Sequence, residues 1–424
     1  MTYLKQQFDE LLAYWPDENE ALRSLRMEAF NHFNELGFPT KKWEEWQFTD
    51  FSEFKKNKYR LSWAKDLPNI PETIPGKIEG SDLVFIINGH YQSQISSMPD
   101  GVTIPSHLDV FEADDQIFSA SQSGNPFKAL NTAMMNSGIV ISVAPNTLIK
   151  KPIQVVYLTT DLSDPLMNHP KFVFNVGENS QATIVEHYIG STDQTYFVNP
   201  VSHVTVKANA SFNHIRIQEE NKSASHVATT EYDLEADSRL NAAHFSSGSK
   251  LFRHDIKLNF NDKGAEAKLN GLCLTESHQH HDQHVMVDHQ NDACQSHQLF
   301  KYILADKSSG VFNGKVVVRE NTKQTDADQS NKNLLLSPDA LMNSNPQLEI
   351  YADDVKCAHG STTGQIDPEA LFYMRSRGIS RPKATELIIG GFAKDVLDSI
   401  SDENISDHIN QKINNWLIGS QNNE

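Results

Sequence analysis

A weak internal repeat constrains the fold of this chain more than any other feature. Four short, strand-like segments follow one another between residues 177 and 275, and each opens with a small residue. The small residues are Ala182, Ala210, Ser238 and Ala265, which gives a period of about 27 to 28 residues. A constant period of this size in strand-rich sequence indicates coils that stack on one another, as in a β-helix. A β-sandwich also contains short strands, but it has no reason to keep a constant period.

The chain divides into three parts. Residues 81–365 consist of short segments that are rich in β-branched residues and closed by Gly, Asn or Pro. Residues 1–80 combine a helical pattern with a proline-containing stretch that indicates a linker, and residues 366–424 are helical again. We therefore expect a mainly β protein whose β-helix core is flanked by helical domains at both ends.

Apolar residues at helical spacing define the expected helices. In the N-terminal part they recur in two groups that end before Gly37, and a further short helix is expected within residues 43–54. In the C-terminal part, Asp367 followed by Pro368 has the pattern of an N-cap and a first helical residue. Another helix opens at Pro382. The last helix carries an apolar stripe of Ile405, Ile409, Ile413 and Leu417.

Charge and cysteine content restrict the partners and the compartment. The formal net charge is −18, which argues against non-specific binding to nucleic acid or to an anionic membrane surface. The three cysteines form no Cys-x-x-Cys pair and are too few for a disulfide framework, as expected in a reducing cytosol. No apolar run approaches the roughly 18 residues of a membrane span, and the N-terminus lacks a signal-peptide pattern. We therefore expect a soluble, cytoplasmic protein.

The segment Leu348–Gln365 is the most informative candidate site. It begins as an alternating strand and places Cys357 and His359 two residues apart, directly before Gly360. Residues i and i+2 share one face of a strand, so a thiolate and an imidazole there could bind one soft metal or a sulfur-rich species. The alternative is that Cys357 is a small buried residue and His359 a hydrogen-bonded core histidine, because a Cys-x-His pair is not a complete ligand set.

A second candidate is the histidine-rich segment Gln279–Ser296. Its metal-ligating side chains include His280, His281, His284, His289 and Cys294. Converging imidazoles and carboxylates could form a zinc or iron site, and a metal-dependent enzyme built on this cluster is the alternative function. The spacing matches no His-Glu-x-x-His or paired Cys-x-x-Cys motif, so a polar strand rich in hydrogen-bonding rings is the competing interpretation.

Several catalytic motifs do not occur in the sequence. It contains no G-x-x-x-x-G-K-[ST], which argues against nucleotide hydrolysis by this chain, and no G-x-S-x-G elbow. It also lacks a G-x-G-x-x-G that opens a helix. Asp353 and Asp354 are adjacent, so on a strand they face opposite ways and form a poor acid–base pair.

Several segments, in order along the chain, resemble the SufB/SufD family of iron–sulfur cluster assembly proteins. They are PTKKWEEWQFTD (39–50), GVFNGKVVV (310–318), QTDADQSNKNLLLS (324–337), LEIYADDVKCAHGSTTGQ (348–365) and LFYMRSRGISRPKATELIIGGFA (371–393). The histidine-rich strand is similar as well. Within the family the chain resembles the SufD branch. SufB-like chains are longer, often carry extra N-terminal cysteines, and have an acidic Cys-Glu-His-Glu form of the motif that is Cys-Ala-His-Gly here. The few cysteines also count against a SufB-like scaffold that holds the cluster itself.

The resemblance implies a fold and a set of partners. The fold would be a right-handed parallel β-helix flanked by helical domains. The chain would be a non-catalytic subunit in a complex with a SufB-like scaffold and a SufC-like ABC ATPase, which accounts for the missing nucleotide motif. The late β-helix strands would pair with SufB. The helices after Asp367 would form the SufC docking surface, for which we single out Leu387, Ile388 and Phe392.

The resemblance also implies roles for the candidate site residues. His359 would lie at the SufB interface, opposite a SufB cysteine, and would hold or orient iron or a transient iron–sulfur cluster shared with SufB. Cys357 is a weaker candidate that either contributes a thiolate or only packs. No family role attaches to His284 and His289, which remain candidate ligands of the alternative metal-dependent enzyme. The sequence leaves open whether a flavin binds and whether the isolated chain forms a homodimer.

Overall fold

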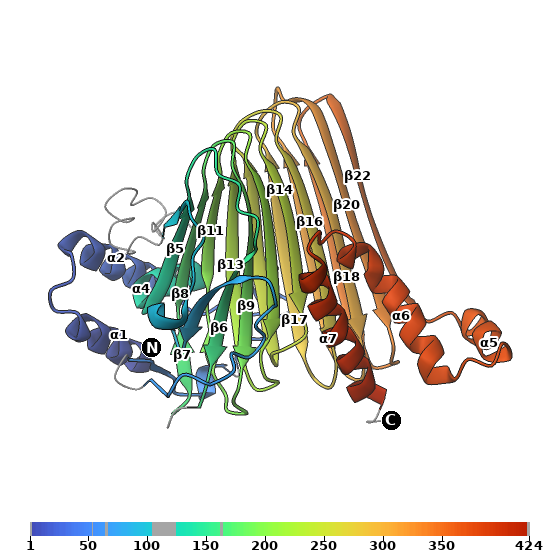
Figure 1. Ribbon diagram of the computed structural model, residues 1–424, viewed down its shortest axis with the longest axis horizontal. Coiled ribbons are helices and arrows are strands. Elements are labelled where there is room, and N and C mark those ends of the chain that lie inside the picture. The colour runs from blue at the N-terminus through green and yellow to red at the C-terminus, as the bar shows by residue number, and fades with distance from the viewer. Residues whose placement is uncertain (1, 53, 64–66, 104–123, 162–163, 422–424) are drawn as a thin grey trace.

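The structure is a computed structural model that describes residues 2–52, 54–63, 67–103, 124–161 and 164–421. Its centre is a parallel β-helix, in which stacked coils build two facing sheets (Figure 1). The main strands of the first sheet are β4 (Val102–Thr103), β5 (Ser137–Val143), β8 (Pro170–Val176), β11 (Val201–Val206), β13 (Ser225–Leu234), β15 (Leu251–Phe260), β17 (His280–His289), β19 (Ser309–Val318) and β21 (Leu341–Ile350). Three short strands pair at its side, namely β1 (Arg60–Leu61), β7 (Leu166–Asn168) and β10 (Phe197–Val198).

The second sheet contains the other strand of each coil. Its strands are β2 (Asp82–Ile87), β3 (His90–Tyr91), β6 (Ile153–Thr159), β9 (Gln181–Gly190), β12 (Ser211–Glu219), β14 (Arg239–Ser246), β16 (Glu266–Thr275), β18 (Gln295–Leu304), β20 (Lys323–Leu335) and β22 (Asp354–Gln365). From β5 to β21 and from β6 to β22 the neighbours in each sheet are parallel, and the apolar core fills the space between the sheets. The predicted mainly β fold of stacked coils is confirmed.

The strand register gives the length of each coil. Ser211 pairs with Arg239, and Arg239 pairs with Glu266, so these two coils have the period that the sequence repeat predicts. The following coils are slightly longer, since Glu266 pairs with Gln295 and Gln295 pairs with Asp326. The repeat found in the sequence therefore corresponds to the short coils that join β12, β14 and β16, whose turns have almost constant length.

Each of these coils turns through a residue in the left-handed conformation. Asn179, Asn209 and Asp237 have φ of 56°, and Gly264 has φ of 75°. Short Asn and Asp side chains and glycine tolerate this conformation better than other residues do. The small, buried residue that follows each of them has a carbonyl that accepts a hydrogen bond from the next coil. These residues are Ser180, Ala210, Ser238 and Ala265, with Cys294 in the same position one coil later.

Two sequence expectations need correction here. Ala182 is not the first small residue of the series, because Gln181 pairs with Ser211 and the position equivalent to Ala210 is Ser180. Cys294 continues the series as a small buried residue, and its thiol donates to backbone carbonyl oxygens of the turn, including that of Asp262. Cys294 is therefore a packing residue of the repeat.

The N-terminal helices lie against the first sheet. They are α1 (Thr2–Tyr14), α2 (Glu20–Leu36) and α4 (Pro126–Met134), and their apolar side chains meet Phe197 and Val227 of the sheet. α2 ends at Gly37, as predicted. The described residues of 43–54 do not form the expected helix, since they contain the 3₁₀ turn η1 (Glu44–Trp46) and the first residue of a second 3₁₀ turn. Two further 3₁₀ turns are η2 (Phe54–Lys56) and η4 (Ser93–Ile95).

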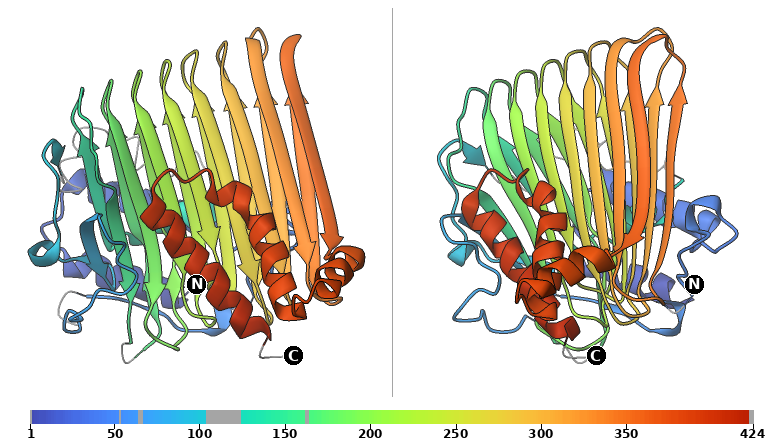
Figure 2. Two further views of the ribbon diagram at one scale, coloured as in Figure 1. Left: turned by 45° about the vertical axis from the view of Figure 1, so that its right-hand side comes forward. Right: turned by 90° about the vertical axis from the view of Figure 1, so that its right-hand side faces the viewer.

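The C-terminal helices lie against the second sheet, on the side of the β-helix away from α1 and α2 (Figure 2). They are α5 (Pro368–Ser376), α6 (Arg381–Leu397) and α7 (Glu403–Gln421). Asp367 caps α5 as predicted, since its side chain accepts a hydrogen bond from the Glu369 N–H. Buried residues of α6 and α7, such as Ile389 and Ile409, pack on Ile217 and its neighbours in the sheet. None of the helices in the described ranges is long and apolar enough to cross a membrane.

The β-helix ends in two long strands with free edges. β21 and β22 are the last strands of their sheets, and each pairs on one side only within the part of the chain that the structure describes. Large apolar side chains are exposed beside these edges at Leu341, Ile350 and Tyr351. We call the surface formed by residues 341–365 the open end. The domain boundaries at residues 80 and 365 remain predictions, although the segment before residue 80 is partly packed, with Ile78 buried against the second sheet.

Candidate functional site

His359 lies at the open end, in a column of side chains that points into the β-helix. Parallel pairing aligns His359 of β22 with Gln329 of β20, and Gln329 with Gln298 of β18. Both glutamines are buried, and side chains in register on adjacent strands point to the same side of a sheet. His359 is exposed because no further coil covers it among the described residues. It is therefore not the buried, hydrogen-bonded core histidine of the alternative interpretation.

Cys357 shares the inward face of β22 with His359, as the strand pattern predicts. It aligns with buried Ala327 and packs against the end of the apolar core. Burial raises the pKa of the Cys357 thiol, and the nearby Asp326 carboxylate raises it further. The raised pKa disfavours the thiolate, which is the form of cysteine that binds metals.

The end of the β-helix interior has hydrogen-bonding side chains near the surface and an aromatic pair one coil below. Asn331 Oδ1 accepts hydrogen bonds from the hydroxyl groups of Ser344, at 2.7 Å, and Ser361, at 3.2 Å. Phe300 and Phe312 align with Asn331 and Ser344 in the preceding coil, and their ring centroids are 5.1 Å apart. The open end thus carries hydrogen-bonding groups, and the aromatic pair lies in the interior beneath them.

The histidine-rich strand β17 distributes its rings over two faces. His281 and His289 point into the β-helix, where His289 Nε2 lies 2.8 Å from Ser296 Oγ. His280 and His284 have the opposite parity and lie on the outer face. One ion cannot bind both His284 and His289, so the geometry does not provide the ligand set that the alternative metal-dependent enzyme requires.

The outer face of β17 instead holds the N-terminal segment that contains η1. Arg253 donates to the Glu45 carbonyl oxygen and to Asp282, and its guanidinium lies 3.9 Å from the Trp46 ring centroid. Thr49 donates to the same Asp282. Burial alone would raise the pKa of Asp282, but His284 and Arg253 outweigh it and hold that pKa well below its usual range. Two segments with a family-like sequence, 39–50 and the histidine-rich strand, therefore meet in a structural clamp.

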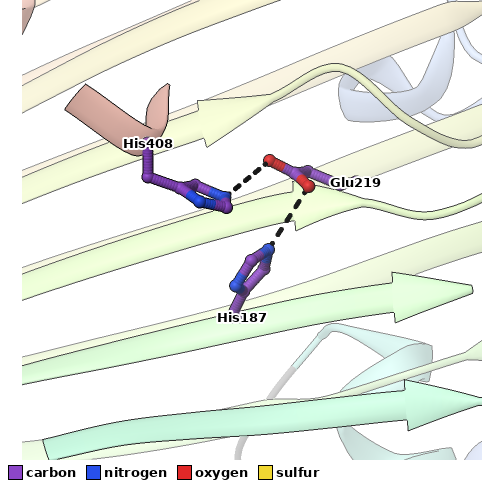
Figure 3. A group of neighbouring side chains, drawn as sticks. All are labelled: His187, Glu219 and His408. Carbon is purple, nitrogen blue, oxygen red and sulfur yellow. Dashed lines mark ion pairs between the residues drawn. The ribbon is translucent and has the colours of Figure 1, made fainter. Parts of the chain in front are cut away.

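A second cluster joins α7 to the second sheet (Figure 3). Glu219 Oε2 lies 3.4 Å from His187 Nε2 and 2.7 Å from Lys412 Nζ, and Glu219 Oε1 lies 3.3 Å from His408 Nε2. The ligand atoms of the two histidines and the glutamate lie within 4.8 Å of one another, so they are candidates for a metal site. We call these four residues the α7 cluster.

Hydrogen bonding around His187 argues against a metal in the α7 cluster. The Gln154 amide accepts from the Ile78 N–H at Oε1 and donates from Nε2 to the Gly76 carbonyl, which fixes its orientation. Gln154 Nε2 then faces His187 Nδ1 at 3.1 Å, so Nδ1 is the acceptor and Nε2 carries the proton. Metal-binding imidazoles have the opposite arrangement, with an acceptor beside the non-ligating nitrogen. Because Lys412 already supplies positive charge to Glu219, we interpret the cluster as an ionic contact that holds α7 on the sheet.

Family comparisons match almost the whole chain. Residues 157–392 match the SufBD core domain of SUF system FeS cluster assembly, and residues 4–155 match the SufBD protein N-terminal region. The chain belongs to the SufBD family. It is therefore an iron–sulfur cluster assembly protein, which confirms the resemblance found in the sequence.

Similar proteins occur in several bacteria. An iron–sulfur cluster assembly SufBD family protein of Synechocystis is 32% identical over 403 residues, which cover 90% of this chain and 88% of the relative. The iron–sulfur cluster assembly protein SufD of Escherichia coli is 29% identical over 398 residues, covering 92% and 93%. SufD of Bacillus subtilis is 25% identical over 407 residues, covering 91% of each chain.

The three apolar residues that we selected for docking differ in exposure in this SufBD protein. Leu387 on α6 is 47% exposed, whereas Ile388 is half-buried. Phe392 is half-buried against the second sheet, where its carbonyl accepts a hydrogen bond from Lys301 Nζ at 2.7 Å. Phe372 and Tyr373 on α5 are 73% and 59% exposed. The sequence did not indicate them, since their helix has no regular apolar stripe.

Proposed function

We propose that this SufBD protein is the SufD-type subunit of a cluster assembly complex. Its open end pairs with a SufB-type scaffold, and its C-terminal helices bind a SufC-type ABC ATPase. It performs no catalysis of its own. Its role is to help acquire iron and to form the cluster at the seam with the scaffold, where His359 holds or orients iron or the nascent cluster as transient cargo.

The observation that carries this proposal is the exposure of His359 beside two free strand edges. A free edge presents unpaired N–H and C=O groups and is a ready template for another chain. β21 and β22 are 10 and 12 residues long, which is long for unprotected edge strands. A partner that pairs there would cover the apolar side chains of Leu341, Ile350 and Tyr351 and would approach the His359 ring. Neutral imidazole is a suitable ligand for Fe²⁺.

A separate ATPase follows from the same proposal. The sequence contains no phosphate-binding loop, so ATP-driven movement has to come from a partner. The exposed apolar residues Leu387, Phe372 and Tyr373 on α5 and α6 offer a contact surface for it. Movement of these helices would reach the open end directly, because α5 follows β22 after only Ile366 and Asp367.

The proposal extends to compartment and self-association. The three cysteines are free thiols, which is compatible with a reducing cytosol. In the absence of the scaffold, the free edges would also allow two copies of this chain to pair as a homodimer. Such a homodimer would dissociate when the scaffold is present, because both partners compete for one surface.

Co-expression with SufB-type and SufC-type partners tests the function. We expect His359→Ala to co-purify with both partners but to contain several-fold less iron and sulfide than the unchanged complex. His278→Ala is the matched control, since His278 is exposed on a turn away from the open end. Wild-type iron and sulfide content in the His359→Ala complex would remove His359 from the assembly site.

A further inference from the structure

Three family-like segments come together in the last coils of the β-helix, two of them through side-chain contact and the third through strand register. Gly314 belongs to the segment 310–318, Gln329 to 324–337 and His359 to 348–365. A Cβ atom at Gly314 would overlap Gln329 Nε2, the nearest atom, and would lie 2.6 Å from its Cδ and 2.8 Å from its Oε1. Glycine at 314 therefore makes room for the Gln329 amide, which extends across the interior from the opposite sheet.

The Gln329 amide is hydrogen-bonded to the preceding coil. Its Nε2 donates to Gln298 Oε1 at 3.1 Å, and both side chains are buried. Stacked amides on adjacent parallel strands form such ladders, in which each amide donates to one neighbour and accepts from the other. Since the donor side of Gln329 faces the preceding coil, its acceptor side is left for the following coil. The side chain at that register position in the following coil is His359.

Gln329 Oε1 is buried and has no hydrogen-bond partner among the described residues. An unpartnered buried acceptor costs roughly 1–3 kcal/mol, so native structures usually provide a donor. The next strand lies about 4.8 Å away, which brings side chains in register into contact. The His359 ring carries an N–H whether it is neutral or charged, and it can therefore supply the missing donor.

We propose that Gln329 is a positioning residue for His359. Its Oε1 accepts a hydrogen bond from one ring nitrogen of His359, and the second ring nitrogen, freed of its proton, faces the partner as the iron ligand. The inference rests on the proposed function of His359. It adds that the Gln329 side chain selects one tautomer of the His359 ring. Hydrogen bonds of this kind orient ligating histidines, and their loss usually weakens metal binding by roughly 10- to 100-fold.

The tautomer of His359 is measurable in the full chain without partners. We expect ¹⁵N shifts of the His359 ring, identified by their absence in His359→Ala, to report one dominant tautomer. Gln329→Met keeps the length of the side chain but removes the acceptor, so the ring should change to the mixed tautomers of a solvated imidazole. Gln329→Glu restores an acceptor and should restore the single tautomer. Gln283→Met is the matched control, because Gln283 is also buried in the interior but aligns with Phe312 on the other sheet.

The assembled complex provides the second measurement. In complexes with the SufB-type and SufC-type partners, Gln329→Met should weaken Fe²⁺ binding by roughly 10- to 100-fold, and Gln329→Glu should bind Fe²⁺ nearly as well as the unchanged complex. Identical tautomers in the unchanged chain and in Gln329→Met would overturn the positioning role, whatever His359 does. A different result would separate the two claims. If the single tautomer is lost in Gln329→Met but the His359→Ala complex keeps wild-type iron and sulfide, the hydrogen bond exists but does not serve iron binding.

Discussion

Glu219 of β12 and His408 of α7 face each other across the junction between the β-helix and the C-terminal helices, with Oε1 3.3 Å from Nε2. The same carboxylate contacts His187 and Lys412. Its single negative charge therefore lies among three basic groups. Protonation of buried His187 would place a charge in the interior and add repulsion against Lys412, so contact between α7 and the sheet should weaken.

We expect α7 to detach as the pH falls from 7 toward 4. Burial lowers the pKa of His187 although Glu219 raises it, so the folded state favours the neutral ring. That contribution to stability is complete above the unfolded pKa of about 6.5 and is lost as the pH falls below it. Burial raises the pKa of Glu219, but His187 and His408 outweigh burial and lower that pKa. The stability that Glu219 contributes is therefore also lost on acidification, below its unfolded pKa of about 4.3.

Hydrogen exchange of residues 403–418 as a function of pH measures this detachment. Glu219→Gln should reduce protection of α7 at pH 7 but keep the loss of protection below about pH 6.5, because burial favours the neutral His187 ring with or without Glu219. His278→Ala, which lies outside the α7 cluster, should leave both unchanged. Equal protection of α7 at pH 7 and pH 4 in the unchanged protein would contradict the ionic role of the cluster.

A buried charge group inside the β-helix should dominate its stability. Burial alone would raise the pKa of Glu186, but His214 and Arg216 lower it to about 2. Arg216→Met leaves the Glu186 carboxylate without its cation and should cost about 3–5 kcal/mol. Urea unfolding at pH 7 measures the loss. Lys207→Met removes the exposed Lys207–Glu235 pair and should cost less than about 1 kcal/mol; equal losses in both variants would refute the assignment.

Leu387 provides the cleanest test of the ATPase docking surface. Leu387→Asp should abolish co-purification with the SufC-type partner and leave thermal stability unchanged, because the side chain is exposed. Phe392→Asp should lower both, since Phe392 packs on the sheet beside Lys301. Met27→Asp on α2 introduces the same charge at a side chain of similar exposure, 49%, and should change neither. Retained binding by Leu387→Asp would exclude this part of α6 from the docking surface.

Ile350 tests the scaffold contact independently of iron. The side chain is 40% exposed at the end of β21. Ile350→Asp would bury a charge at the proposed seam and should weaken association with the SufB-type partner by roughly tenfold or more. Analytical ultracentrifugation of the mixed chains measures the affinity, with Met27→Asp as the reference. Unaltered affinity would mean that the scaffold binds elsewhere.

Local sequence patterns predicted much of the fold. The nearly constant spacing of Ala210, Ser238 and Ala265 indicated stacked coils, because turns of similar length repeat there. Asp367 and Gly37 identified helix ends through capping chemistry that depends only on neighbouring residues. Ala182 was assigned to the wrong register, because the coil before Ser211 is longer than the next two. The length of a coil depends on its turns, and the alternation of apolar and polar residues within a strand does not reveal that length.

The site was less predictable because its contacts join distant coils. Parity along a strand was enough to place Cys357 and His359 on one face and could also have separated His284 from His289. No sequence pattern connected Gln329 with His359, which lie on successive coils, or Glu219 with His408 on a helix beyond the last coil. Such contacts depend on strand register and on helix packing, and both are determined by the whole β-helix.

Hydrogen exchange at the open end tests the central claim most directly. Amide protection of residues 341–365 is measured in the chain alone and in its complex with the SufB-type and SufC-type partners, with residues 211–219 of β12 as the internal reference. Pairing at the free edges predicts that amides of β21 and β22 become strongly protected in the complex while β12 is unchanged. Unchanged exchange in β21 and β22 within an intact complex would contradict the account.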